Sequence, residues 1–119
     1  MDKTIDIAGQ KVLVRKTFGT ELRYKRQFGR EFSTDLRAIL ALRAKLTPDA
    51  SKEEKAAAVL SAETEWMYDI LFIMAQQADP TITDELDWLD NFDSVNIWLI
   101  FDQIMPLLIG ESKVSPKNG

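Results

Sequence analysis

The stretch from Ser51 to Ala78 carries the longest uninterrupted helical pattern in the chain, and the other segments are sized to pack around it. Ser51 and Glu54 form a capping box, in which each side chain accepts a hydrogen bond from the other residue's backbone amide. Pro80 ends the pattern, because proline disfavours helical geometry in the preceding residue. Apolar residues cover well over half of the circumference at about 100° per residue. We therefore expect a central helix that contacts several neighbours.

The composition predicts one soluble globular domain. The chain has 119 residues, of which 45% are hydrophobic and 29% are charged, enough for one substantial core. It has no cysteine and no histidine, which excludes thiolate nucleophiles, disulfides, imidazole bases and the usual zinc ligands. The first residues lack the apolar core of a signal peptide, and the most apolar run, 97–109, is too short to span a bilayer. We expect no cofactor, no metal, no membrane association and a cytoplasmic location.

Charge is segregated along the chain. Residues 1–55 hold 13 Lys/Arg and 8 Asp/Glu, a balance of +5, whereas residues 56–112 hold 11 acids and no Lys or Arg, a balance of −11. A basic half beside an acidic half predicts either attraction between elements of one chain or head-to-tail association of copies.

The predicted fold class is α+β and predominantly helical, with an N-terminal β-hairpin packed on a bundle of four or five helices. Alternating β-branched residues predict the hairpin over residues 4–16, and because two strands alone are marginally stable it should lie on a helix. Apolar spacing predicts helices at about 20–28, 34–46, 52–78, 84–90 and 94–109, all in one domain over residues 1–110. Residues 111–119 lack apolar periodicity and are predicted to be a disordered tail.

Turn and cap residues mark the ends of these helices. Pro106 should kink or fray the final turn of the last helix. Gly29 should close the first helix in the left-handed conformation. The predicted N-terminal caps are Thr20, then Ser33 or Thr34, and finally Asp93 or Ser94, and Thr83 with Asp84-Glu85 should begin the short acidic helix.

Acidic residues are abundant but indicate no catalytic site. Carboxylates cluster in residues 63–65, 84–87 and 90–93, where acids favour helix N-termini and solvated faces. The spacing from Asp79 to Asp93 fits no EF-hand loop. Glu63 lies within the apolar stripe of the central helix, which indicates either a buried partner such as an arginine or a first half of the helix that is not packed. A small carboxylate enzyme would need a pocket lined by Glu63.

A basic run from Arg23 to Arg30 offers a different function. Cations beside aromatic rings suit nucleic acid, where phosphates meet charge and bases stack. The chain is acidic overall, however, and Tyr24 and Phe28 have the spacing of core residues. A small phage or bacterial DNA-binding regulator is therefore the alternative rather than the main hypothesis.

The segment KVLVRKTFGTELRYKRQFGREFSTDL, residues 11–36, resembles the tail assembly chaperones of long-tailed bacteriophages and prophages. Those proteins commonly have a strand pair, then a T-F-G phrase followed by an aromatic residue and by a second glycine, and then a capped helix. The rest of the chain agrees in being small, acidic and helical, while its basic N-terminal half departs from the family pattern. The matching residues are Thr17, Phe18, Gly19, Tyr24, Phe28 and Gly29.

This resemblance implies a non-enzymatic protein of the bacterial host cytoplasm. It would bind the tape measure protein, a long helical chain with exposed apolar surface, and would self-associate. In this family a −1 ribosomal frameshift often produces a longer form, which would recruit tail tube protein. Codons for Pro116-Lys117-Asn118 can contain the slippery sequence A-AAA-AAC.

Surplus apolar surface in the acidic half predicts where a partner binds. The last helix has more apolar surface than a domain of this size readily covers. We assign Phe18, Tyr24, Phe28 and Trp66 to the core. The residues predicted to contact a partner are Trp88, Phe92, Trp98, Phe101 and Met105.

Overall fold

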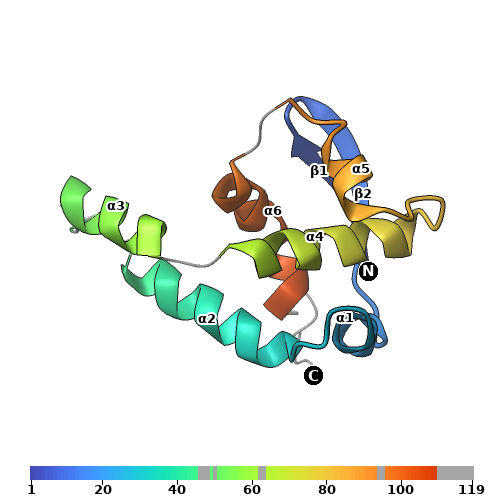
Figure 1. Cartoon of the computed structure of the whole chain (residues 1–119), viewed down its shortest axis with the longest axis horizontal. Helices are drawn as coiled ribbons and strands as arrows, with labels where there is room; N and C mark the ends of the chain where they lie inside the picture. Colours follow the sequence, from blue (N-terminus) through green and yellow to red (C-terminus); the bar gives the residue numbers. More distant parts are fainter. Residues whose placement is uncertain (46–48, 50, 62–63, 94–95, 110–119) are drawn as a thin grey trace, which may run out of the picture.

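The structure is a computed structural model that describes residues 1–45, 49, 51–61, 64–93 and 96–109. Its described elements are a two-stranded antiparallel sheet followed by six helices, so the predicted α+β, mainly helical fold class is confirmed. The hairpin and α5 lie on one side of α4, α1 and α2 lie on the other, and α3 extends away from the rest (Figure 1). The predicted tail, 111–119, lies outside the described residues.

The hairpin forms because its sequence matches both its turn and its packing. Strands β1 (Asp2–Ile7) and β2 (Gln10–Arg15) are joined by two residues with positive φ, Ala8 at 53° and Gly9 at 84°. Two such residues give the strand twist of a tight hairpin turn. Apolar side chains on the inner face, including those of Ile5, Ile7 and Val14, are buried. β2 packs on α4 and β1 on α6, which confirms that the hairpin lies on helices.

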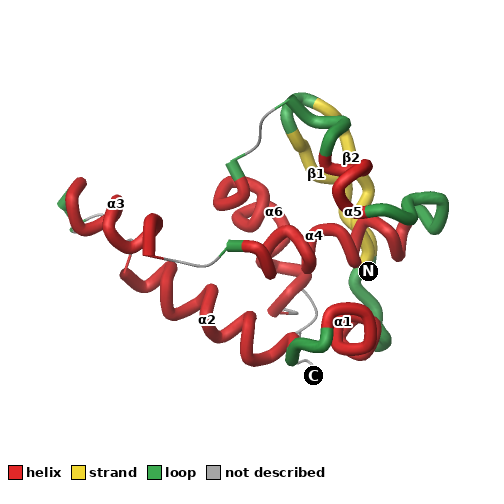
Figure 2. Tube along the Cα trace, in the orientation of Figure 1, coloured by secondary structure: helices red, strands yellow, loops and turns green. Residues whose placement is uncertain are grey.

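The helices are arranged around α4 (Figure 2). α4 contacts β2, α1 and α6, and a run of its side chains from Ile70 to Ala75 is buried. The other helices are α1 (Thr20–Phe28), α2 (Phe32–Lys45), α3 (Lys52–Ser61), α5 (Glu85–Leu89) and α6 (Ile97–Ile109), with α4 at Glu65–Ala78.

The prediction of one central helix over 52–78 is wrong. α3 ends at Ser61, and α4 begins at Glu65 after Thr64. Apolar residues recur with helical spacing in both α3 and α4, and this spacing does not show whether the backbone turns between the two helices. Ser61 and Thr64 are residue types that bond to nearby backbone and favour helix ends. The capping box at Ser51 is confirmed, because the Ser51 amide donates to Glu54 Oε1 at 2.7 Å and the Glu54 amide to Ser51 Oγ at 3.0 Å.

Two predicted helix ends are confirmed. Gly29 ends α1 with φ 72°, and Asp84 caps α5 by accepting from the Asp87 amide at 2.8 Å.

Several other predicted ends are wrong. α2 begins before Ser33, at Phe32, and Thr20 is the first residue of α1 rather than its cap, because its hydroxyl bonds elsewhere. α6 begins at Ile97 after Asn96, whose side chain accepts from the amide of Trp98, so Asp93 does not cap it. Ser94 lies outside the described residues.

α6 continues to Ile109, as predicted, so Pro106 does not fray its final turn. The missing amide of a proline removes one backbone hydrogen bond but does not by itself stop a helix whose neighbours are buried. Leu107 and Leu108 are both buried, which holds this last turn against the core.

Candidate functional site

Three of the five residues predicted to contact a partner are buried. Phe92, Phe101 and Met105 have exposed fractions of 8%, 0% and 7%. The broad apolar face of α6 is directed at β1 and α4, so this fold assigns the fully buried Phe101 to the core. Trp88 and Trp98 are half-buried and pack against the same core.

Trp88 belongs to an aromatic cluster rather than to an open surface. Its ring lies 6.1 Å from that of Phe72 on α4 and 5.4 Å from that of Phe92, centroid to centroid. These separations are typical of favourable tilted and edge-to-face ring pairs. On α5 and α6 the strongly exposed apolar side chains are instead those of Leu86 and Leu99.

The loop before α1 presents the most exposed large apolar side chain among the described residues. Phe18 is fully exposed, whereas the sequence assigned it to the core. Of the other residues assigned there, Tyr24 and Trp66 are buried, and Phe28 is half-buried and packs against the core. An aromatic residue in a loop belongs to no helical or strand period, and this was the signal that could have separated Phe18 from the others.

A hydrogen-bond network holds this loop on α4. Gln77 Nε2 donates to Thr17 Oγ1 at 2.6 Å, and Thr20 Oγ1 donates to Gln77 Oε1 at 2.7 Å. The Thr17 amide in turn donates to Thr20 Oγ1 at 2.8 Å. The two threonines that flank Phe18-Gly19 are therefore tied to the same glutamine. This network fixes the backbone of the loop while leaving the phenyl ring in solvent.

A groove lies between α1 and α4 beside this loop. We call it the α1–α4 groove; its volume is about 810 Å³. Its wall begins at Gly19, the residue after Phe18, and includes the half-exposed Leu22. The groove combines apolar, amide and cationic groups and is of a size that fits a side-chain cluster of a partner. Its lining residues are Gly19, Leu22, Arg23, Arg26, Gln27, Ile73, Gln76, Gln77 and Pro80.

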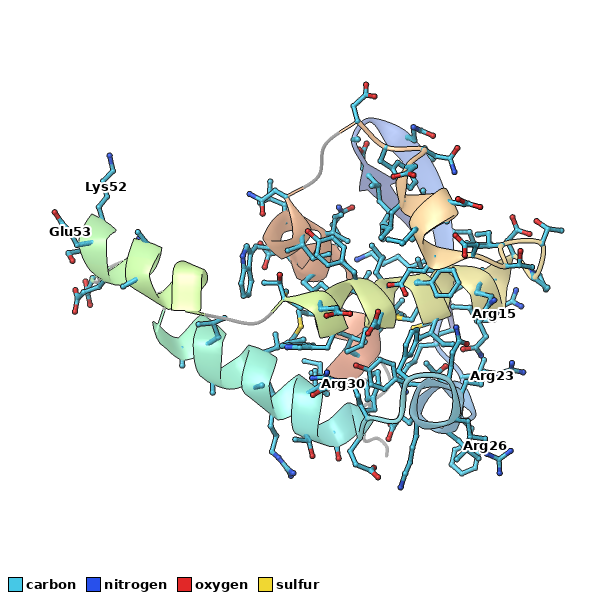
Figure 3. All side chains as sticks on the ribbon, in the orientation of Figure 1. Arg15, Arg23, Arg26, Arg30, Lys52 and Glu53 are labelled. Atoms are coloured by element: carbon cyan, nitrogen blue, oxygen red, sulfur yellow. The ribbon has the colours of Figure 1, made fainter. Side chains whose placement is uncertain are left out.

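The basic run divides into paired and unpaired cations. Arg30 Nε donates to Asp35 Oδ2 at 2.9 Å and points inward, and Lys25 pairs with Glu31. Arg23 and Arg26 project outward from α1 (Figure 3). Within the part of the chain that the structure describes, neither forms a salt bridge. The two free cations are thus those that line the α1–α4 groove.

Asp35 also anchors the first two helices to each other. The Tyr24 hydroxyl, on α1, donates to Asp35 Oδ2 on α2 at 2.7 Å. Burial and the neighbouring carboxylate raise the pKa of Tyr24 well above its ordinary value, so the phenol stays protonated. Asp35 therefore accepts from both Arg30 and Tyr24 and forms a structural contact between α1 and α2.

A second polar contact joins two carboxyl groups. Burial raises the pKa of Glu85 on α5 to about 8, and a hydrogen bond with Asp69 on α4 and the charge of Asp69 add to the shift. Burial likewise raises the pKa of Asp69. Two adjacent carboxyls in a partly buried site share one proton rather than both ionising. Because Glu85 lies on α5 and Asp69 on α4, the pair joins these two helices. Neither residue lines the α1–α4 groove.

Metal binding, membrane spanning and a carboxylate site at Glu63 are three further possibilities that the sequence raises. No group of three or more Asp, Glu, His or Cys within these ranges is placed to hold a metal ion. None of the helices among them is long and apolar enough to cross a membrane. Glu63, on which a carboxylate enzyme would depend, lies outside the described residues.

Comparison with models of known protein families gives no match, and comparisons with curated proteins and with solved structures give none either.

Proposed function

We propose that the chain is a non-enzymatic tail assembly chaperone of a long-tailed bacteriophage or prophage, acting in the bacterial host cytoplasm. In this role it binds the tape measure protein, self-associates and, through a longer frameshifted form, helps to recruit tail tube subunits. One observation carries the proposal. The T-F-G phrase of the resemblance forms a tethered loop that exposes Phe18 beside the α1–α4 groove.

The α1–α4 groove has the properties that a helical client requires. Phe18 and Leu22 offer apolar contacts for the stripe of an amphipathic helix, and Arg23 and Arg26 offer charge to acids beside that stripe. Few apolar side chains and solvent-exposed charges give weak, salt-sensitive binding. Weak binding suits a chaperone, because the client must be released when tube subunits surround it.

The coding sequence provides the first test. We expect the nucleotides that encode Lys113 to Gly119 to contain a slippery heptamer followed by a long open −1 frame. Codons that break the heptamer, or a −1 frame that stops at once, would remove the longer form from the proposal.

Co-expression with the large helical protein encoded downstream is the functional test. The chain should keep that client soluble and should co-purify with it, whereas the client alone should aggregate. A client that remains insoluble, or that is equally soluble without the chain, would contradict the proposal.

A further inference from the structure

The two edges of the hairpin differ in whether they are covered. The Met1 amine donates to the Lys16 carbonyl at 2.7 Å and the Lys16 amide to the Met1 carbonyl at 2.9 Å, which makes this pair a hydrogen-bonded one. Hydrogen-bonded pairs alternate along an antiparallel ladder. By the strand register, Thr4 and Asp6 of β1 and Lys11 and Leu13 of β2 then turn their amides and carbonyls outward.

The edge of β1 is covered by α6 at Asp6. The Asp6 amide donates to Gln103 Oε1 at 2.9 Å, and Gln103 Nε2 donates to the Asp6 carbonyl at 2.8 Å. The side-chain amide of Gln103 thus pairs with both backbone groups of Asp6, as a residue of a neighbouring strand would. Lys3 Nζ also donates to the Gln103 carbonyl, at 2.5 Å. Covering an edge in this way is how proteins prevent another chain from pairing with it.

The edge of β2 has no such cover. Among the described residues no hydrogen bond outside the hairpin reaches the backbone of Lys11 or Leu13. A second groove of about 550 Å³ runs beside this edge, and Val12, Ile82 and Trp88, all half-buried, are among its lining residues. We call it the β2 groove.

Two hydrogen bonds join the ends of β2 to neighbouring segments of the chain. Gln10 Nε2 donates to the Asn91 carbonyl at 3.1 Å, and Arg15 Nη1 donates to the Gln77 carbonyl at 3.4 Å. These bonds hold the two ends of β2 in place, and the outward backbone of Lys11 and Leu13 lies between them.

We propose that the outer edge of β2 binds an extended segment of a partner protein as a third strand. Backbone hydrogen bonds to Lys11 and Leu13 would provide the pairing, and alternate apolar side chains would enter the β2 groove towards Val12 and Trp88. The residue opposite Lys11 would be acidic, because the side chain of this cation is 73% exposed on the outer face of the strand.

Charge argues against a second copy of this chain as the occupant. Antiparallel pairing of β2 with itself, centred on Leu13, would place Lys11 of each copy opposite Arg15 of the other, and like charges directly opposed are destabilising. Asp6 already pairs with Lys11 at 3.1 Å, but such an exposed pair contributes little and leaves Lys11 able to bind a partner's acid. Arg15, in contrast, is held by two hydrogen bonds to Asp2 and one to the Gln77 carbonyl. The inference uses a surface separate from the α1–α4 groove and does not depend on the proposed function.

Proline substitution tests the proposal on the full chain. The probe is a labelled, capped peptide of sequence Glu-Val-Thr-Val-Glu, which places threonine opposite Leu13 and glutamates opposite Lys11 and Arg15. Leu13→Pro removes only an outward amide and should preserve the hairpin while weakening binding at least about tenfold. Thr4→Pro, at the position paired with Leu13 on the β1 edge, is the matched control and should bind normally.

The expected result is saturable binding at up to millimolar peptide, with NMR shifts centred on the amides of Lys11 and Leu13. Absence of binding over that range, or equal binding by Leu13→Pro, would overturn the proposal. If Leu13→Pro fails to fold, binding of the unaltered chain is measured instead to the same peptide with its threonine amide N-methylated, which removes the donor that would pair with Leu13. Its loss of binding supports strand addition, and unchanged binding excludes it.

Discussion

Phe18 and Phe101 are chemically identical side chains in opposite surroundings. Phe18 lies in a loop between β2 and α1 and is wholly in solvent, whereas Phe101 lies on α6 and is wholly buried. The loop is held by polar bonds from Thr17 and Thr20 to Gln77, which fix its backbone without covering its ring. α6 is held by the apolar contacts of its buried face, to which Gln103 adds hydrogen bonds with β1. An apolar side chain is therefore a reliable sign of a core position only in a helix or strand that is held to the protein by burying the face on which that side chain lies.

The largest expected effect is a difference in the free energy of unfolding between alanine variants of these two phenylalanines. Phe101→Ala should destabilise the protein by about 3–5 kcal/mol, because it leaves a cavity in a packed core. Phe18→Ala should change the free energy of unfolding by no more than about 0.5 kcal/mol. Urea unfolding at equilibrium measures both. Similar losses from the two substitutions would contradict the contrast.

Trp98 tests whether α6 contributes to association as well as to the core. We expect Trp98→Asp to leave a folded protein that no longer self-associates or holds its client, because a charge at this half-buried ring disrupts an apolar surface. Circular dichroism reports folding, and sedimentation with a pull-down reports association. Leu99→Asp, at the adjacent exposed position, shows whether the surface extends beyond the ring. Unchanged binding by Trp98→Asp would remove α6 from the partner surface.

The carboxyl pair between α4 and α5 predicts a dependence of stability on pH. The pKa of Glu85 rises from its ordinary 4.5 to about 8 in the folded protein, so the folded state binds this proton more tightly. Stability from Glu85 is therefore present below pH 4.5 and is lost as pH rises towards 8. Glu85→Gln should raise the melting temperature at pH 8 by several degrees relative to the unaltered chain, and should have less effect at pH 5. An equal effect at both pH values would contradict the shared proton.

DNA binding is the smallest expected effect and tests the alternative function. Only Arg23 and Arg26 of the basic run are free of salt bridges among the described residues, and the chain carries a net charge of −4. We expect no electrophoretic shift of duplex DNA even at low salt. A steeply salt-dependent affinity that is lost in Arg23→Glu would instead support the regulator.

The sequence predicted the elements better than it predicted their surfaces. The hairpin, the left-handed Gly29 and the capping box at Ser51 depend on local chemistry, and all were confirmed. The break between α3 and α4 was not predicted, because a helical apolar period continues across it.

The candidate site was mostly missed for a related reason. Spacing showed that α6 has a broad apolar face but not that β1 and α4 would cover it. Similarly, no local pattern shows that Gln77 lies against Thr17 and Thr20, contacts about 60 residues apart in sequence that form only when α4 meets the loop. The exposure of Phe18 follows from those long-range contacts.

The most direct test of the proposed function is co-purification of the proposed client, a large helical protein, with variants that alter Phe18 and the α1–α4 groove. Phe18→Asp combined with Leu22→Asp should abolish co-purification while leaving the unfolding transition close to that of the unaltered chain. Leu40→Asp, which alters a comparably exposed leucine on α2, is the control and should retain the client. Retention of the client by the folded double variant would contradict the account.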